Sequence, residues 1–164
     1  MASTEAVISY FGAERAESLL FICVGLVAME LAWTCWRKGA SDQARGAALA
    51  LVVVACIQLV VGGTVFVRSP HDQARVVQMV QAEPARVRSE EVPRMETVMR
   101  NFRVYRWIEA VLLGLSLLWA AVAARGSWWR GVGLGLMPQA ALMLLLDELA
   151  EQRGAVYLAW LQAV

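Results

Sequence analysis

The most regular pattern in the chain is a set of long apolar runs, each ended by charged residues. Four such runs occur, at 17–36, 46–67, 107–124 and 129–146. The first three contain about the 20 mostly apolar residues that an α-helix needs to cross a bilayer. The fourth reaches that length when the tryptophans before Arg130 are included, and tryptophan is common where a helix leaves lipid. The pattern predicts an all-α integral membrane protein with a bundle of four transmembrane helices.

Composition supports this interpretation. Of the 164 residues, 59% are hydrophobic and 18% are charged, with a net charge of +1, whereas soluble domains are about 45–50% apolar and about 25% charged. Four buried helices of a soluble protein are the competing interpretation, but core helices seldom contain about 20 uninterrupted apolar residues. The runs lack the alternation of a transmembrane β-barrel. The length fits one domain, 1–164, and the near-neutral charge argues against nucleic acid as a partner.

The segment 68–106, between the second and third runs, is too regular for a loop. Apolar residues recur at helical spacing on both sides of Pro84 and Pro93. These residues are Val76, Val77 and Val80 before the prolines, and Met95, Val98, Met99, Phe102 and Tyr105 after them. We therefore expect the second and third helices to extend beyond the bilayer as a water-exposed helical hairpin.

Both ends of the chain also carry apolar faces. Val7, Tyr10 and Phe11 precede the first run, and Tyr157 and Leu161 follow the fourth. An even number of spans separates each end from the hairpin, so all three are expected on the same side of the membrane. Either the end segments join the hairpin in one continuous bundle, or they lie on the membrane surface as interfacial helices.

The orientation depends on how charge is counted. The hairpin alone carries eight arginines offset by five acidic residues, and the short turns carry Arg37, Lys38, Arg45, Arg125 and Arg130. A count of Lys and Arg places the hairpin on the cytoplasmic side of the membrane. Net charge instead places the short turns on that side. We adopt the second interpretation, with the termini and hairpin in the periplasm of a bacterial inner membrane. The use of 14 arginines and one lysine is typical of GC-rich bacterial genomes.

Glu30 is the most unusual residue within a run. It lies seven residues before Arg37, which is about 10 Å along a helix axis. An ionisable residue at membrane depth is a functional-site candidate because its burial in lipid is costly. Gln58, Ser116 and Gln139 are expected near the same layer. Such a layer either binds a proton or cation or holds helices together by hydrogen bonds.

A second set of polar residues is expected where the helices leave the membrane. Arg106 and Glu109 are neighbours at i, i+3 on one helix, and Asp147 and Glu148 reach a similar level on another. An inward ring of these charges would form a gate or a polar-ligand pocket. The alternative is a structural belt of ion pairs.

Metal chemistry has weaker candidates. Met79, Met95 and Met99 lie in the hairpin, and thioethers suit Cu(I), but the single histidine, His71, is about two turns away along the axis. Packing of the methionines in a helical core is the favoured interpretation, and no cofactor is expected. The three cysteines form no C-x-x-C pair and are expected to be buried as small apolar residues.

Spacing identifies no catalytic group, so a non-enzymatic role is expected. The leading hypothesis is a small membrane protein that binds a partner protein or assembles with itself. The alternative is a channel or transporter protomer that moves protons or cations past Glu30 and the cluster of Arg106, Glu109 and Asp147. A second alternative is a metal-sensing extracytoplasmic hairpin.

Overall fold

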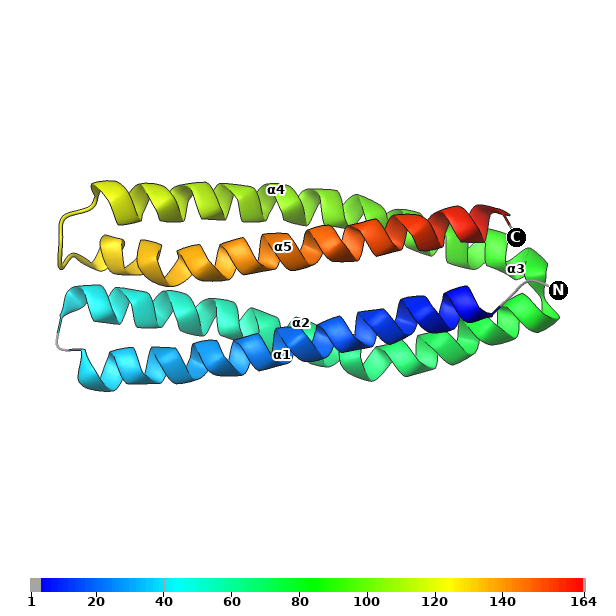
Figure 1. The fold of residues 1–164 in the computed structure, drawn as a ribbon, viewed down its shortest axis with the longest axis horizontal. Helices are drawn as coiled ribbons and strands as arrows, with labels where there is room; N and C mark the ends of the chain where they lie inside the picture. The colour runs from blue at the N-terminus through cyan, green and yellow to red at the C-terminus, as the bar shows by residue number, and fades with distance from the viewer. Residues whose placement is uncertain (1–3, 40, 164) are drawn as a thin grey trace.

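The computed structural model describes residues 4–39 and 41–163, and within these ranges every regular element is helical (Figure 1). The long helices are α1 (Glu5–Lys38), α2 (Asp42–Ala82), α4 (Val92–Val122) and α5 (Trp128–Ala163). The short helix α3 (Pro84–Arg86) and the π-helical turn η1 (Val87–Glu91) join α2 to α4. In the described part of the chain, four helices are thus long and apolar enough to cross a membrane, which confirms the all-α class.

Local sequence explains where several helices begin and end. The Ser41 hydroxyl accepts a hydrogen bond from the Ala44 N–H at 3.3 Å and so caps α2. Pro84 and Pro93 lie in first turns, where the missing proline N–H removes no helical hydrogen bond. Gly126 adopts a φ of +83° in the turn after α4, a conformation that glycine reaches without a steric penalty.

The long helices form a row rather than a closed ring. α1 packs on α2, α2 on α5, and α5 on α4 (Figure 1). Among the described residues, the α4 backbone lies close to no long helix other than α5, and α4 meets α1 through side chains, as where the Arg94 guanidinium lies over the Phe11 ring. The short turns are linked nonetheless, because the Gln43 side chain accepts a hydrogen bond from the Gly126 N–H at 2.8 Å.

Glycine allows close approach of the helix backbones in this row. A Cβ added to Gly131 or Gly135 would lie 1.9 Å or 2.7 Å from a backbone oxygen of α2. A Cβ on Gly133 would instead lie 2.6 Å from the Ser116 carbonyl oxygen on α4. The three glycines therefore place α5 tightly between its two neighbours, as small-xxx-small spacing does in membrane helices.

The larger of the two clusters of buried hydrophobic residues in the described chain lies at the end that holds the termini, here called the hairpin half (residues 5–16, 68–106 and 150–163). Every element except α3 contributes a buried side chain to it. The core residues are Val7, Phe11, Val76, Met79, Val80, Val87, Met95, Tyr157 and Leu161. The end segments thus extend α1 and α5 into a shared core.

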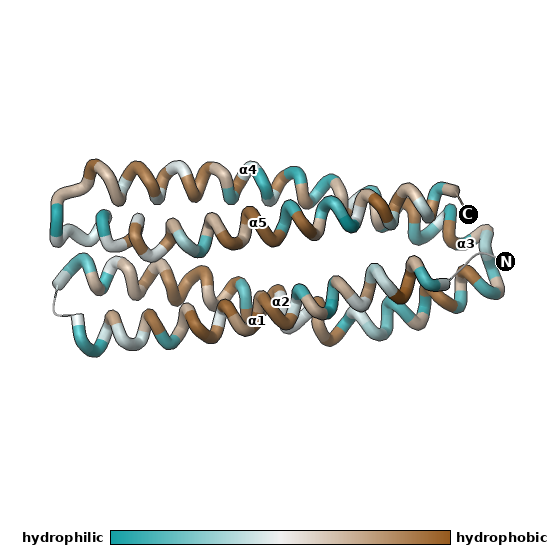
Figure 2. Tube along the Cα trace, in the orientation of Figure 1, coloured by the Kyte–Doolittle hydropathy of each residue, from teal (hydrophilic) through white to brown (hydrophobic). Residues whose placement is uncertain are grey.

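The rest of the molecule, here called the apolar half (residues 17–67 and 107–149), is rich in hydrophobic residues (Figure 2), and many of their side chains are exposed. Large exposed hydrophobic residues of the described chain belong to this half, apart from Ile8, Val104, Tyr105 and Val156. In the most apolar 18-residue stretch of the helical segment Pro84–Val122, only 11% of the residues are buried. An apolar surface of this extent is stable against lipid and unstable in water.

Candidate functional site

Glu30 lies on the outside of the helix row, not in an inner polar layer. Its carboxyl is exposed, and no hydrogen bond or ion pair joins it to any described residue. α1 faces α2 through Ala28 and Ala32, each 1% exposed. Glu30 is two residues from both, so at 3.6 residues per turn it points about 200° away. Glu30 therefore points outward, whereas Gln58, Ser116 and Gln139 are buried.

Glu30 lies at the edge of an open groove of about 830 Å³ on the outer surface of α1 and α2. Apolar side chains and three tryptophans line this groove. They are Leu26, Met29, Ala32, Trp33 and Trp36 from α1, Ala48, Leu49 and Val52 from α2, and Trp128 from α5. The name Glu30 groove is used below for this surface. Its shape suits large apolar side chains, with one carboxyl to select a polar group among them.

Gln58 and Gln139 meet in the interior between α2 and α5. The Gln58 side-chain Nε2 donates to the Gln139 side-chain Oε1 at 3.0 Å. The Gln58 Oε1 is buried without a partner among the described residues. Ser116 is also fully buried on α4, but its hydroxyl donates to the Leu113 backbone oxygen. Two members of the expected polar layer are therefore in contact, and the third is satisfied within its own helix.

Four charged residues gather where α4 and α5 approach the hairpin half, as expected from the sequence. The Arg106 guanidinium donates to Glu148 at 2.9 Å and also pairs with Glu151. Glu109 is buried and faces Asp147 across the two helices. With Glu151, the five residues form two separate units, because Arg106 makes no ion pair with Glu109 or Asp147.

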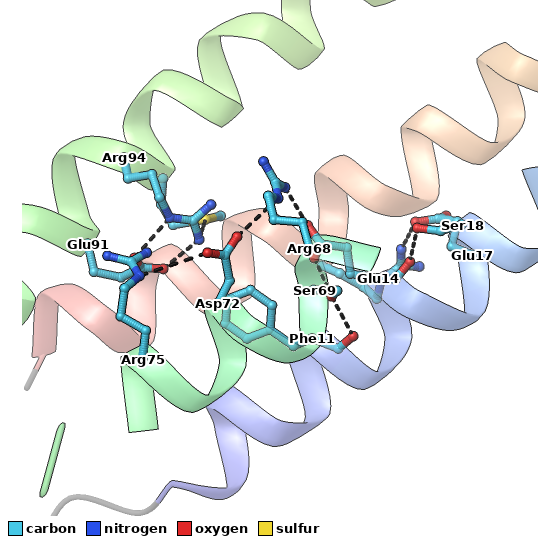
Figure 3. A network of polar contacts seen from close by, with 12 residues as sticks. Phe11, Glu14, Glu17, Ser18, Arg68, Ser69, Asp72, Arg75, Glu91 and Arg94 are labelled. Carbon is cyan, nitrogen blue, oxygen red and sulfur yellow. Dashed lines mark hydrogen bonds and ion pairs between the residues drawn. The ribbon is translucent and has the colours of Figure 1, made fainter. Parts of the chain in front are cut away.

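A larger polar network in the hairpin half was not identified from the sequence (Figure 3). Glu91, at the end of η1, is fully buried and accepts from Arg94 Nε at 2.9 Å and Nη2 at 2.5 Å. Arg75 of α2 donates to the same carboxylate at 3.3 Å. This bidentate pair with a second arginine joins the π-helical turn to α2. Glu91 and Arg94 are neighbours at i, i+3, but Arg75 is 16 residues away in the chain, so no spacing along one helix identifies its contact with Glu91.

The network continues along α2 to α1. Arg68 and Arg75 both pair with Asp72, and Arg68 also lies 3.7 Å from Glu14. The Ser69 hydroxyl lies 2.6 Å from a Glu14 carboxylate oxygen, to which it donates. Pro70 follows directly and removes one backbone donor from α2. The polar contacts thus stabilise the contact between α1 and α2 next to the position where Pro70 removes a helical hydrogen bond.

The hairpin methionines pack as apolar side chains. Met79 and Met95 belong to the hydrophobic core, and Met99 lies against Gly154. His71 is exposed, outside this core. In residues 4–39 and 41–163, no three His, Cys, Asp or Glu side chains gather at metal-binding distances. Cys23 and Cys56 are exposed on the apolar half, so the expectation that they are buried is wrong.

The aromatic side chains of the end segments lie in a low-polarity environment. Burial raises the pKa of both Tyr10 and Tyr157 above that of a free phenol, and the carboxylates of Glu14 and Glu91 contribute in the same direction. These rings therefore remain neutral and act as packing groups.

No known family model, curated protein or solved structure matches this chain.

Proposed function

We propose that this protein is a non-enzymatic membrane protein that binds a transmembrane segment of another protein in the Glu30 groove. The position of Glu30 carries the proposal. Its carboxyl lies on the outer surface of the apolar half without a partner among the described residues. A carboxylate placed against lipid costs several kcal/mol unless another group pairs with it.

The depth of the groove supports a helical partner. Trp33, Trp36 and Trp128 line the part near the short turns, and tryptophan is enriched at the lipid–water boundary. Along α1, Glu30 lies about one turn deeper than Trp33 and nearly two turns deeper than Trp36. Water and headgroups reach the tryptophans more readily than the carboxyl. A partner helix with a basic or hydrogen-bond-donating side chain at this depth would satisfy Glu30, while its apolar residues fill the groove.

Charge favours a different protein over a second copy of this chain. A symmetric dimer through the groove would bring two Glu30 side chains toward one two-fold axis, and like charges repel strongly at low dielectric. Self-assembly remains a distinct outcome of the test. The proton- or cation-handling alternative places Glu30 and the Arg106, Glu109 and Asp147 cluster on one path, and an outward Glu30 does not favour that arrangement.

The proposal is tested by photo-crosslinking in native membranes. A photoreactive residue at Leu49, in the groove, is expected to form an adduct with a membrane protein whose crosslinked span contains Lys or Arg. The same residue at Leu118, which is exposed on α4, serves as the surface control. Glu30→Lys should abolish the Leu49 adduct, and a basic-to-acidic change in the identified span should restore it. Glu96→Gln, at an exposed acid of the hairpin half, should leave it unchanged.

Two results would contradict the proposal. Adducts from Leu49 that contain only lipid would show that the groove is a lipid-facing surface. Adducts that contain only a second copy of the chain, with matching dimers on native gels, would replace the partner by self-assembly.

A further inference from the structure

Glu109 is the most isolated buried carboxyl in the described chain. Glu109 is 4% exposed, and its Oε2 has no hydrogen-bond partner among the described residues. Burial of an unpaired carboxylate costs several kcal/mol. The charge of the Glu109 carboxylate on α4 must therefore be neutralised by another group or by a proton.

The nearest polar group is a second carboxyl. Asp147 of α5 lies within hydrogen-bonding reach of Glu109 and is itself half-buried. Two ionised carboxylates at this distance repel each other. When one of them carries a proton, it becomes a donor, and the pair forms a strong hydrogen bond.

The nearby cations are already paired. On α4, Arg106 pairs with Glu148 and Glu151. On α5 and α1, Arg153 pairs with Glu17. On α2, Arg68 pairs with Glu14 and Asp72. Among the described residues, these pairs leave Glu109 and Asp147 without a cationic partner, and Glu151 adds a further negative charge near Asp147.

We propose that Glu109 and Asp147 form a proton-binding site, in which one proton shared between the two carboxyls joins α4 to α5. A metal ion is a poor occupant because only two ligand side chains meet here, and the described residues contain no larger cluster. An open groove of about 470 Å³ adjoins the site, with Arg106 and Glu148 in its lining.

The proton has a structural consequence because, within the described residues, α5 is the only long helix whose backbone lies close along α4. With the proton bound, the hydrogen bond holds α4 at this level. As pH rises through the titration of the pair, the proton leaves and the carboxylates repel each other. The contact between α4 and α5 therefore weakens with increasing pH. This site is separate from the Glu30 groove, and its failure would leave the proposed function intact.

Infrared spectroscopy of the full-length protein in lipid nanodiscs tests the site directly. The wild type should show a carboxylic-acid C=O band near neutral pH that shifts in D₂O and disappears on titration to higher pH. The double variant Glu109→Gln with Asp147→Asn should lose this band. Glu30→Gln and Glu96→Gln should retain it. An unchanged band in the double variant, or no such band in the wild type, would overturn the proposal.

A distance measurement provides an independent test. Spin labels at Val104 and Ala155, which are exposed on α4 and α5, would be placed in a variant without the three native cysteines. The distance between the labels should increase at high pH in the otherwise native protein. It should stay constant in Asp147→Asn, because an amide donates to Glu109 without a titrating proton. An equal response to pH in both proteins would refute the shared proton.

Discussion

Tyr10 of α1 stacks face to face on Tyr157 of α5, with ring centroids 4.2 Å apart and ring planes 8° apart. The two rings come from opposite ends of the chain, which lie at the same end of the molecule (Figure 1). Offset aromatic pairs contribute about 0.5–1.5 kcal/mol beyond the burial of their area. The stack therefore helps to close the hairpin half, where both end segments enter one core.

Two substitutions at Tyr157 separate the ring from its hydroxyl. Tyr157→Ala should destabilise the hairpin half by about 3–5 kcal/mol, because it removes a large buried ring. Tyr157→Phe should retain or slightly raise the stability, since the buried hydroxyl has no hydrogen-bond partner. Reversible unfolding in mixed micelles, followed by tryptophan fluorescence, measures both effects. Val156→Ala, at a side chain that is 74% exposed, is the control. If Tyr157→Phe lowered the stability as much as Tyr157→Ala, the ring would not be the stabilising group.

The buried tyrosines should also show a distinct titration. Burial raises the pKa of Tyr10 and Tyr157, so each neutral ring stabilises the fold fully below the ordinary phenol value of about 10. This contribution is lost as pH rises through the higher pKa of the folded state. An ultraviolet absorbance titration should find two phenols that ionise only when the hairpin half unfolds. Ionisation of all three tyrosines near the ordinary value, with the fold intact, would refute the burial.

Glu91 should be more important for stability than its neighbour in sequence. Glu91→Gln leaves two arginines with a neutral partner in a buried position, and the loss of one member of a buried ion pair costs about 3–5 kcal/mol. Glu90→Gln is the matched control, because Glu90 pairs with Arg86 on the surface and exposed pairs contribute little. The unfolding midpoint should fall sharply only for Glu91→Gln. Equal midpoints for the two variants would show that the network in Figure 3 is not structural.

Gly131 should not tolerate a methyl group. A Cβ at this position would lie 1.9 Å from the Gln43 carbonyl oxygen, so Gly131→Ala must push α5 away from α2. Overpacking of this kind costs about 1–3 kcal/mol. Gly114→Ala is the control, since no neighbouring atom lies within 4 Å of its added Cβ. Thermal unfolding in nanodiscs should show a lower midpoint for Gly131→Ala alone, and unchanged midpoints for both would exclude the close approach.

The four helices were predictable because local chemistry determines them. The apolar runs are long enough for a span, and charged residues or prolines mark where most of them end. The spacing of Gly131 and Gly135 also favours a close helix contact. The identity of the neighbouring helix was not predictable, because the same spacing fits any helix that can approach. The fold shows that Gly131 contacts α2 and Gly133 contacts α4.

The position of Glu30 shows why the candidate site was harder to predict. A soluble helix has one apolar stripe, and a polar residue outside that stripe faces water. α1 is apolar on most sides, so its sequence does not indicate which side faces α2. Small residues determine that side, with Ala28 and Ala32 buried, and Glu30 consequently points outward. Cys23, also on α1, is exposed for the same reason.

The sequence alone determined the helical class, the four candidate spans and the charged level near Arg106, since each depends on residue type and on spacing along one helix. Only the tertiary structure decided that the helices form a row, that Glu30 and Glu109 face different surroundings, and that Glu91 is buried between two arginines. These relationships join residues distant in the chain. They depend on which helix faces another and at what rotation, and in an apolar environment small residues and hydrogen bonds determine this, not hydrophobic patterning.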